Sequence, residues 1–245
     1  MRRPRSPLIA ALLGACLILG ACNQGGSTAS SETEPAPAAQ NQTNNAPGVN
    51  IHPRTDSPAP PSPSTSPSTP TPAAVPAGYA SVSAPTAGVT FAAPADWLVV
   101  SASEVQADES KLEDLAAQLN MSADSLRTIM SPVDIYVLDQ SGTQDFSNNI
   151  NVLSQTYPAN TTVTEDALAA GVKSIGATPG QFSTESTTNG DAYVLTYTWD
   201  MGGQTLEGAA MYIPNADGKY VSITITTLDT ALTGQIVSKI IATAA

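Results

Sequence analysis

The sequence predicts an α+β domain in which one antiparallel β-sheet has helices on both faces, an αβα sandwich. Two observations predict it. Strand-like segments between 181 and 227 are separated by the turn dipeptides Asn189-Gly190 and Gly202-Gly203, which make neighbouring strands run antiparallel. Helical apolar periodicity occurs near the start, in the middle and at the end of the region 79–245, so helices are available to cover both faces of the sheet.

The first half of this region predicts strands interrupted by two helices. The first helix should begin at Ser103, because Gln106 follows three residues later in the spacing of a capping box. A shorter helix should follow Ser122. The strands of this half are expected as two short ones within 88–102 about a turn at 94–96, one at 133–139 and one at 149–155.

The second half predicts a helix, four strands and a final helix. Thr162 and Glu165 form a second capping pattern, which starts a helix whose buried stripe is Leu168, Val172 and Ile175. The strands are expected at 181–188, 191–200, 204–213 and 219–227. Asp229 should cap the last helix, whose inward-facing residues are Leu232, Ile236, Val237 and Ile240.

The chain before this domain has the pattern of an export signal. Three arginines precede a 12-residue apolar run from Leu8 to Leu19, and such a run is shorter than the roughly 20 residues that a membrane-spanning helix needs. The small residues Gly20 and Ala21 follow, then Cys22. Two alternatives stay open: a plain signal peptide with a chance cysteine, and an uncleaved short anchor.

The tetrapeptide Leu19-Gly20-Ala21-Cys22 resembles the lipoprotein box of bacteria. That resemblance implies cleavage between Ala21 and Cys22 and a diacylglyceryl group on the Cys22 sulfur, so residues 1–21 would be a lipoprotein signal peptide. Two acyl chains hold a protein stably on a membrane, whereas one holds it only marginally. We therefore expect a lipid-anchored protein on the outer face of the cell membrane.

Residues 22–78 should form a tether between the anchor and the domain. They contain 12 of the 20 prolines and no Phe, Trp or Tyr, so they cannot build a core and are expected to be disordered. Ser and Thr beside Pro also suit O-glycosylation, although a plain spacer explains the same composition. The only histidine, His52, falls here and is most simply incidental.

Charge excludes several classes of partner. Without the three arginines of the signal, six basic residues remain against 21 acidic ones, a net charge of −15. This balance argues against nucleic acid, which needs a basic surface, and against adhesion of the domain to anionic lipid headgroups. The charge is better suited to keeping an exported domain soluble, and we expect a monomer.

The residues for common catalytic chemistry are missing from 79–245. This region has no His and no Cys, which argues against Ser-His-Asp and Cys-His catalysis and against a zinc site. Acidic residues crowd the first helix, and they fit a solvated helix start better than a glycosidase pair. Asn215 and Asp217 hint at a calcium loop but fit a polar hairpin turn better. We expect no enzyme activity, no cofactor and no metal.

One strand carries a regular aromatic pattern. Tyr193, Leu195, Tyr197 and Trp199 alternate onto one face of the segment 191–200, and Trp97 is a candidate to join that side. Either this face packs beneath helices, with hydroxyls at its rim, or part of it lines a groove for a ligand or partner. If a binding site exists, these four aromatic residues are where it is expected.

The domain also resembles a known family. The segment "GVTFAAPADW" is similar to the opening hairpin of the PsbP-like (Mog/PsbP) superfamily, and "NINV" and "KYVSITITT" before an amphipathic helix are similar too. With the lipoprotein box and the Pro/Thr-rich linker, the chain most resembles the LpqN/LpqT lipoproteins of actinobacteria. The resemblance implies an αβα fold and a non-enzymatic docking or binding role, and it supplies no catalytic residues.

Three functions follow as hypotheses. The first is a cell-surface lipoprotein whose tethered domain docks an envelope partner and assists the handling of envelope lipids or proteins. The second is a carrier of lipids or small molecules, which requires a cavity beside the aromatic face. The third is a carboxylate-dependent hydrolase, which requires two carboxylates that face each other across a cleft.

Overall fold

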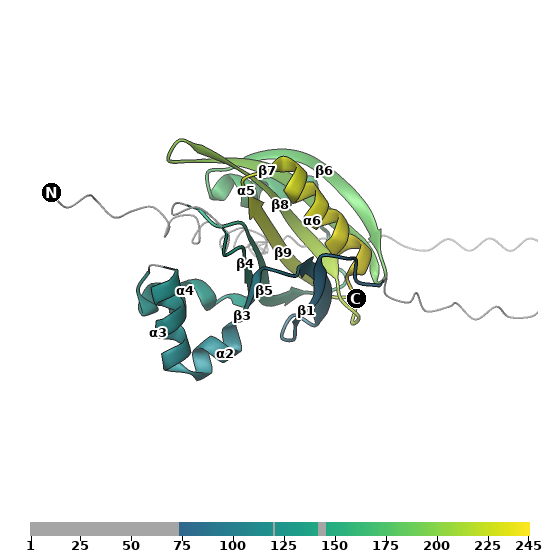
Figure 1. Cartoon of the computed structure of the whole chain (residues 1–245). Coiled ribbons are helices and arrows are strands. Elements are labelled where there is room, and N and C mark those ends of the chain that lie inside the picture. Colours follow the sequence, from purple (N-terminus) through teal and green to yellow (C-terminus); the bar gives the residue numbers. More distant parts are fainter. Residues whose placement is uncertain (1–73, 120, 142–145) are drawn as a thin grey trace, which may run out of the picture. The chain divides into compact units, whose positions relative to one another are not determined.

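The computed structural model describes residues 74–119, 121–141 and 146–245, and these form an α+β domain (Figure 1). A seven-stranded, antiparallel sheet has the order β3-β4-β5-β9-β8-β7-β6, and β1 and β2 form a separate antiparallel pair. The strands are β1 (Tyr79–Ala84), β2 (Val89–Pro94), β3 (Leu98–Ser101), β4 (Val133–Leu138), β5 (Asn149–Tyr157), β6 (Thr178–Thr187), β7 (Gly190–Met201), β8 (Gln204–Pro214) and β9 (Tyr220–Thr227). The helices are α2 (Ala102–Ala107), α3 (Glu109–Gln118), α4 (Ala123–Met130), α5 (Glu165–Ser174) and α6 (Thr230–Thr243).

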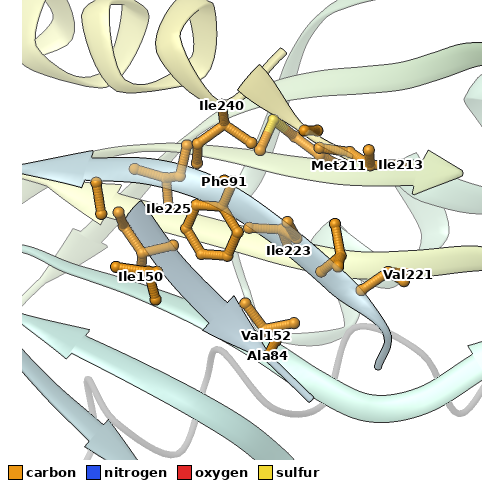
Figure 2. Packing of buried hydrophobic residues seen from close by; sticks show 14 of the residues in the cluster. Ala84, Phe91, Ile150, Val152, Met211, Ile213, Val221, Ile223, Ile225 and Ile240 are labelled. Atoms are coloured by element: carbon orange, nitrogen blue, oxygen red, sulfur yellow. The ribbon is translucent and has the colours of Figure 1, made fainter. Parts of the chain in front are cut away.

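One face of the large sheet is covered by α6 and by the β1–β2 pair. Figure 2 shows the ring of Phe91, from β2, among Ile150, Ile223 and Ile225 of the sheet, with Ile240 of α6 beside them. All of these side chains are buried, and burying each contributes about 1.5–3 kcal/mol to stability. This cluster is the largest part of the core of the described domain.

The opposite face is covered at two places. Helices α2, α3 and α4 pack over the β3–β5 side, where their apolar residues meet Tyr136 and Leu138. Helix α5 packs over the β6–β8 side, where Leu168 and Val172 meet Leu195 and other residues of the sheet. Helices therefore lie on both faces of an antiparallel sheet, and the predicted fold class is confirmed.

Local side-chain chemistry fixes where four of the described helices, α3 to α6, begin. Asp108, Ser122, Thr164 and Asp229 each precede a helix with extended backbone, and each side chain accepts a hydrogen bond from a backbone N–H of the first turn. Such caps typically contribute about 1 kcal/mol each. The expectation that a helix follows Ser122 and the assignment of Asp229 as a cap are confirmed.

Several expected boundaries are wrong. The two strands within 88–102 do not pair with each other: β2 pairs with β1, which the sequence did not predict, and β3 pairs with β4. Ser103 does not cap the first helix, because β3 continues to Ser101 and the helix begins at Ala102. The cap of α5 is Thr164 rather than Thr162.

Two further corrections concern breaks and turns. The first predicted helix divides into α2 and α3 at Asp108, whose extended backbone ends one helix while its carboxylate caps the next. The β6–β7 turn consists of Thr188 and Asn189 rather than Asn189-Gly190, because Thr187 pairs directly with Gly190. The Gly202-Gly203 turn is confirmed, with φ of 59° and 91°, a conformation that favours glycine.

The turn between β1 and β2 is attached to the large sheet by side chains. The buried carboxylate of Asp134 accepts hydrogen bonds from the backbone N–H groups of Thr86, at 2.8 Å, and Ala87, at 2.9 Å. Asn215 donates from Nδ2 to the Ala87 carbonyl at 2.9 Å. At the outer edge of β2, Thr90 and Ala245 exchange two backbone hydrogen bonds. The β1–β2 pair is therefore fixed at its turn and along its edge.

Candidate functional site

Five aromatic side chains form a row across one end of the large sheet, on the face that carries α5. Five adjacent strands, β5, β9, β8, β7 and β6, contribute one ring each, in that order. The members, called the aromatic row below, are Tyr157, Tyr220, Tyr212, Tyr193 and Phe182. The five rings therefore belong to one contiguous aromatic cluster at this end of the sheet.

The rings are in direct contact along the row. The ring centroids of Tyr157 and Tyr212 are 5.2 Å apart, with an edge-to-face arrangement, and those of Tyr193 and Tyr220 are 5.7 Å apart with the planes tilted by 55°. Phe182 stacks on Tyr193 at 6.2 Å with only 14° between the ring planes. These separations lie in the range in which aromatic pairs attract beyond simple area burial.

Strand register explains why the rings meet. Tyr193 lies directly opposite Tyr212 in the β7–β8 pair, and Tyr157 lies directly opposite Tyr220 in the β5–β9 pair. Directly opposed side chains in an antiparallel pair have Cβ atoms about 5 Å apart. Helix α5 covers Leu195 and Tyr197 of the same face, and the row lies beyond them toward the β6–β7 turn.

Four of the five rings remain half-buried, and only Tyr212 is buried, at 5% exposure. Burial, followed by a hydrogen bond with Tyr193 and the nearby Asp191 charge, raises the pKa of the Tyr220 hydroxyl above its usual 10.0. Asp191 lies on β7 two residues before Tyr193, and therefore on the same face of the strand. The row thus combines ring surface, phenolic hydroxyls and a neighbouring carboxylate.

The structure separates the four aromatic residues that the sequence proposed as one site. Tyr193 belongs to the row. Tyr197 is a core residue, 1% exposed, whose hydroxyl donates to the Ile225 carbonyl at 3.2 Å and bonds Thr226 Oγ1 at 2.7 Å. Its pKa is raised to about 12 by burial, and the bond to Thr226 opposes that shift. The interpretation of this part of the strand as a core face is therefore the correct one.

The two tryptophans also lie apart from the row. Trp199 is six residues beyond Tyr193 on β7, about 20 Å away along the strand, and approaches Gly176 at the end of α5. Trp97 is 8% exposed and packs in the core on the opposite face of the sheet, with Phe91. The expectation that Trp97 joins the aromatic side is wrong.

The other members of the row, Tyr157, Phe182, Tyr212 and Tyr220, were missed by the sequence analysis. The sequence does contain a pattern that predicts the position of one of them, Tyr212. The predicted two-residue turn at Gly202-Gly203 sets the pairing of its flanking strands, and counting back from it places Tyr193 opposite Tyr212. The pairing of Tyr157 with Tyr220 joins strands that are distant in sequence and has a register shift, so no turn in the sequence predicts it.

A carrier would need an internal cavity, and one pocket within the described residues is small. It has a volume of about 10 Å³, enough for about one water molecule, and lies between α3, α4 and the sheet. Its lining is apolar, with Leu115, Leu126 and Ile129 among the walls. This pocket lies on the same face of the sheet as the aromatic row but beneath α3 and α4, and it gives the carrier hypothesis no support.

The carboxylates of the first helices have structural contacts. Asp108 caps α3, and its pKa is lowered chiefly by the hydrogen bond from the Ser110 side chain. Glu109 forms an ion pair with Arg127 at 2.7 Å, and Arg127 also contacts Asp124. In the described part of the chain, no group of three or more His, Cys, Asp or Glu side chains is arranged to hold a metal ion.

The suspected calcium loop is a hairpin turn. Asn215 Oδ1 accepts hydrogen bonds from the backbone N–H groups of Asp217 and Lys219, at 3.1 and 3.0 Å, inside the β8–β9 connection. Its Nδ2 is occupied by the Ala87 carbonyl, so the side chain is fully engaged with the protein. Asn215 therefore has a structural role, as the alternative interpretation predicts.

The predictions for Ala21, Cys22 and His52, and for nearly all of the tether, lie outside the described residues. Within residues 74–119, 121–141 and 146–245, none of the helices has both the length and the apolar character needed to cross a membrane.

Comparisons with known proteins found likenesses among solved structures alone. No protein-family model matches the chain, and no curated protein matches it. Among solved structures, the chain is similar to the solution structure of cyanobacterial PsbP (CyanoP) from Synechocystis sp. PCC 6803, with 17% identity, 66% of this chain and 91% of that chain covered, and a TM-score of 0.43. The α+β architecture described above rests on this chain's own strands and helices.

Proposed function

We propose that this chain is a non-catalytic, cell-surface lipoprotein whose domain docks an envelope partner through the aromatic row. Lipid on Cys22 would hold it on the outer face of the cell membrane, and residues 23–78 would carry the domain away from that surface. The same proposal identifies the chain as an LpqN/LpqT-like lipoprotein, which the lipoprotein box, the Pro/Thr-rich linker and the strand pattern support.

The observation that carries the proposal is the aromatic row itself. Tyrosine and other aromatic side chains are enriched where proteins bind each other, because they offer large contact areas at a small cost in conformational entropy. Five adjacent strands carry the row, four of its five rings are half-buried, and the sheet already fixes this surface. A preformed surface loses little entropy on binding, which favours docking.

Photo-crosslinking in cells that make the protein tests this function. The full chain would carry p-benzoylphenylalanine in place of Phe182, in the row, or in place of Val99, which is 44% exposed on the edge strand β3 and serves as the control. We expect a discrete envelope product from position 182 and none from position 99.

A second pair of variants decides whether that product depends on the row. Tyr193→Ala should reduce crosslinking from position 182 at least about tenfold, the effect of losing 1.4 kcal/mol of binding free energy. Trp199→Ala, on the same face of the same strand but outside the row, should leave it unchanged. Equal yields from the two variants would refute docking through the aromatic row.

Cell fractionation tests the anchor independently. The chain should sediment with membranes, and the Cys22→Ser variant should be released or remain unprocessed, because its hydroxyl cannot accept the lipid as the thiolate does. Membrane association that is unchanged in Cys22→Ser would contradict the lipid-anchor part of the proposal and leave docking through the row to be judged by crosslinking.

A further inference from the structure

We propose that the edge of β6 binds an extended, basic segment of the partner polypeptide, which joins the seven-stranded sheet as an eighth strand beside Phe182. This inference rests on the proposed function, because it states how the partner that docks at the aromatic row is held. Three features of β6 support it: its place at the sheet edge, a regular stretch that contains neither proline nor lysine, and the charges around it.

β6 is a long strand at one edge of the sheet. It is the last strand in the sheet order, so among the described strands only β7 pairs with it, and Figure 1 shows it along the outer margin of the sheet. None of its ten residues is buried. The strand at the other edge, β3, has only four residues. β6 therefore offers the longer series of backbone donors and acceptors to another strand.

The half of β6 nearest the β6–β7 turn is regular. Every residue from Phe182 to Thr187 pairs in step with β7, and the register shift of this strand pair lies before Phe182. Alternate residues of an antiparallel edge strand direct N–H and C=O away from the neighbouring strand. Counted from the Thr187–Gly190 pair beside the turn, these are Phe182, Thr184 and Ser186. An extended segment can complete the hydrogen bonding of these groups.

This half of β6 lacks most of the devices that keep sheet edges from pairing. Natural edges are protected by proline, lysine or a bulge. In β6, Pro179 and the register shift both lie before the segment 182–187, which contains neither proline nor lysine. Its one charged residue is Glu185. The segment is therefore open to an added strand, and Glu185 disfavours a strand that carries negative charge.

Charge selects a basic segment. Glu185 is exposed on the face that carries α6, because it lies opposite Ala192 of the core on that side. Asp191 is exposed on the other face, where it lies opposite Ser186. Residues 79–245 carry 18 acidic and five basic side chains, so the domain repels a second copy of itself and attracts a basic segment. Successive basic residues of an added strand point to opposite faces and approach both carboxylates.

Phe182 connects the sheet edge with the aromatic row. Its ring is half-buried and stacks on Tyr193, with centroids 6.2 Å apart and 14° between the planes. A side chain directly opposite Phe182 on an added strand has its Cβ about 5 Å away. An apolar or aromatic side chain at that position extends the row by one strand. The segment that fits is therefore extended, with such a residue beside basic ones.

Peptide binding to the full chain, held in detergent micelles, tests this inference. The probe is a synthetic peptide matched in length to residues 182–187, built of threonine and valine with a central tyrosine and a lysine at each end. We expect hydrogen exchange to slow at least about tenfold at the amides of Phe182, Thr184 and Ser186, and to stay unchanged in β3. Equal protection of β3, or no alternation along β6, would overturn the inference.

Modified peptides test whether backbone hydrogen bonds hold the probe. A peptide with N-methyl groups on alternate residues keeps the N–H donors along one of its edges and should still bind. A peptide with an N-methyl group on every residue has none and should bind at least about tenfold more weakly. Equal binding of these two peptides would show that side chains alone hold the probe, and would overturn strand addition.

Variants of β6 provide the matched test on the protein side. Thr184→Pro removes an N–H that points away from β7, so the pairing with β7 is kept, and it should weaken peptide binding at least about tenfold. Thr184→Val keeps that N–H and should bind as wild type does. Glu185→Gln should weaken the lysine peptide about two- to fivefold and leave a lysine-free peptide unaffected. Equal binding by Thr184→Pro and Thr184→Val would contradict the inference.

Crosslinking in cells separates this inference from the proposed function. The product from position 182 should be lost in Thr184→Pro, as in Tyr193→Ala. A product that depends on Tyr193 but persists in Thr184→Pro would retain docking through the aromatic row and reject strand addition. Alternating protection along β6 without any peptide would show that a second copy or another segment of the chain occupies the edge, and would also reject the inference.

Discussion

The ring of Tyr197 lies across Gly208, the residue directly opposite it on the neighbouring strand, and reaches the strand beyond. A Cβ atom on Gly208 would overlap the ring carbons of Tyr197, so only glycine fits there. The Tyr197 hydroxyl bonds Thr226, which is the residue paired with Gly208 on β9. One side chain therefore connects three strands beneath α5, next to the aromatic row.

The first prediction concerns this crossing. Gly208→Ala should lower the free energy of unfolding by about 1–3 kcal/mol, because the added methyl group must displace the Tyr197 ring from a packed core. Chemical denaturation measures the change. In the double variant with Tyr197→Leu the two effects should not add, since the overlap disappears. Additive losses would show that the ring does not constrain position 208.

The second prediction concerns pH. The pKa of Tyr197 is raised from 10.0 to about 12 in the folded domain, so the neutral hydroxyl stabilises the fold below pH 10. That stability should be lost as the pH rises from 10 to about 12, with a total of about 3 kcal/mol. Denaturation curves at several alkaline pH values measure it. Tyr197→Phe, which has no group to ionise, should lose this part of the pH dependence, and an identical slope in both proteins would contradict the assignment.

The third prediction concerns the attachment of the β1–β2 turn. Asp134→Ala removes an acceptor of two backbone hydrogen bonds, and Ala87 is left with a buried N–H that has lost its partner. We expect a loss of about 2–3 kcal/mol and faster hydrogen exchange at the Ala87 amide. Asp96→Ala, at an exposed acid in the next turn, should stay within about 0.5 kcal/mol of wild type. Equal stability of the two variants would show that Asp134 does not stabilise the attachment of the β1–β2 turn.

The fourth prediction concerns Asn151, which is 0% exposed in the centre of β5. Within the described chain, neither atom of its side-chain amide has a hydrogen-bond partner. A buried amide without partners typically lowers stability by about 1–3 kcal/mol, so Asn151→Leu, which keeps the shape, should raise the free energy of unfolding by about that amount. Thermal unfolding measures it. A marked loss instead would indicate a bound internal water at the amide.

Much of the fold was predictable because its signals are local. The Gly202-Gly203 turn and the caps Ser122 and Asp229 act through bonds within a few residues, and the sequence displays them directly. The strand β1 was not predictable in this way. Its sequence, YASVSA, is short and has little strand preference, and it forms a strand through pairing with β2 and through distant contacts such as Asp134 with the following turn.

The candidate site was only partly predictable for a similar reason. Alternation along β7 correctly placed Tyr193 and Tyr197 on one face, but alternation does not say which residue a helix covers. Helix α5 buries Tyr197 and leaves Tyr193 half-buried, and that difference decides which residue can contact a partner. The rings from β5 and β9 join the row through a pairing whose register shifts between Val152 and Thr156, a shift that no local pattern encodes.

The separate β1–β2 pair predicts how the domain should respond to mechanical load. Tension applied to the chain before Tyr79 acts first on β1. The backbone hydrogen bonds of β1 are made with β2 and not with the seven-stranded sheet. Under a pull, these few bonds and the Asp134 contacts at the turn should yield before the ladders of the large sheet do. The β1 strand would then separate from β2 first, and the seven-stranded sheet, with its aromatic row, would stay folded.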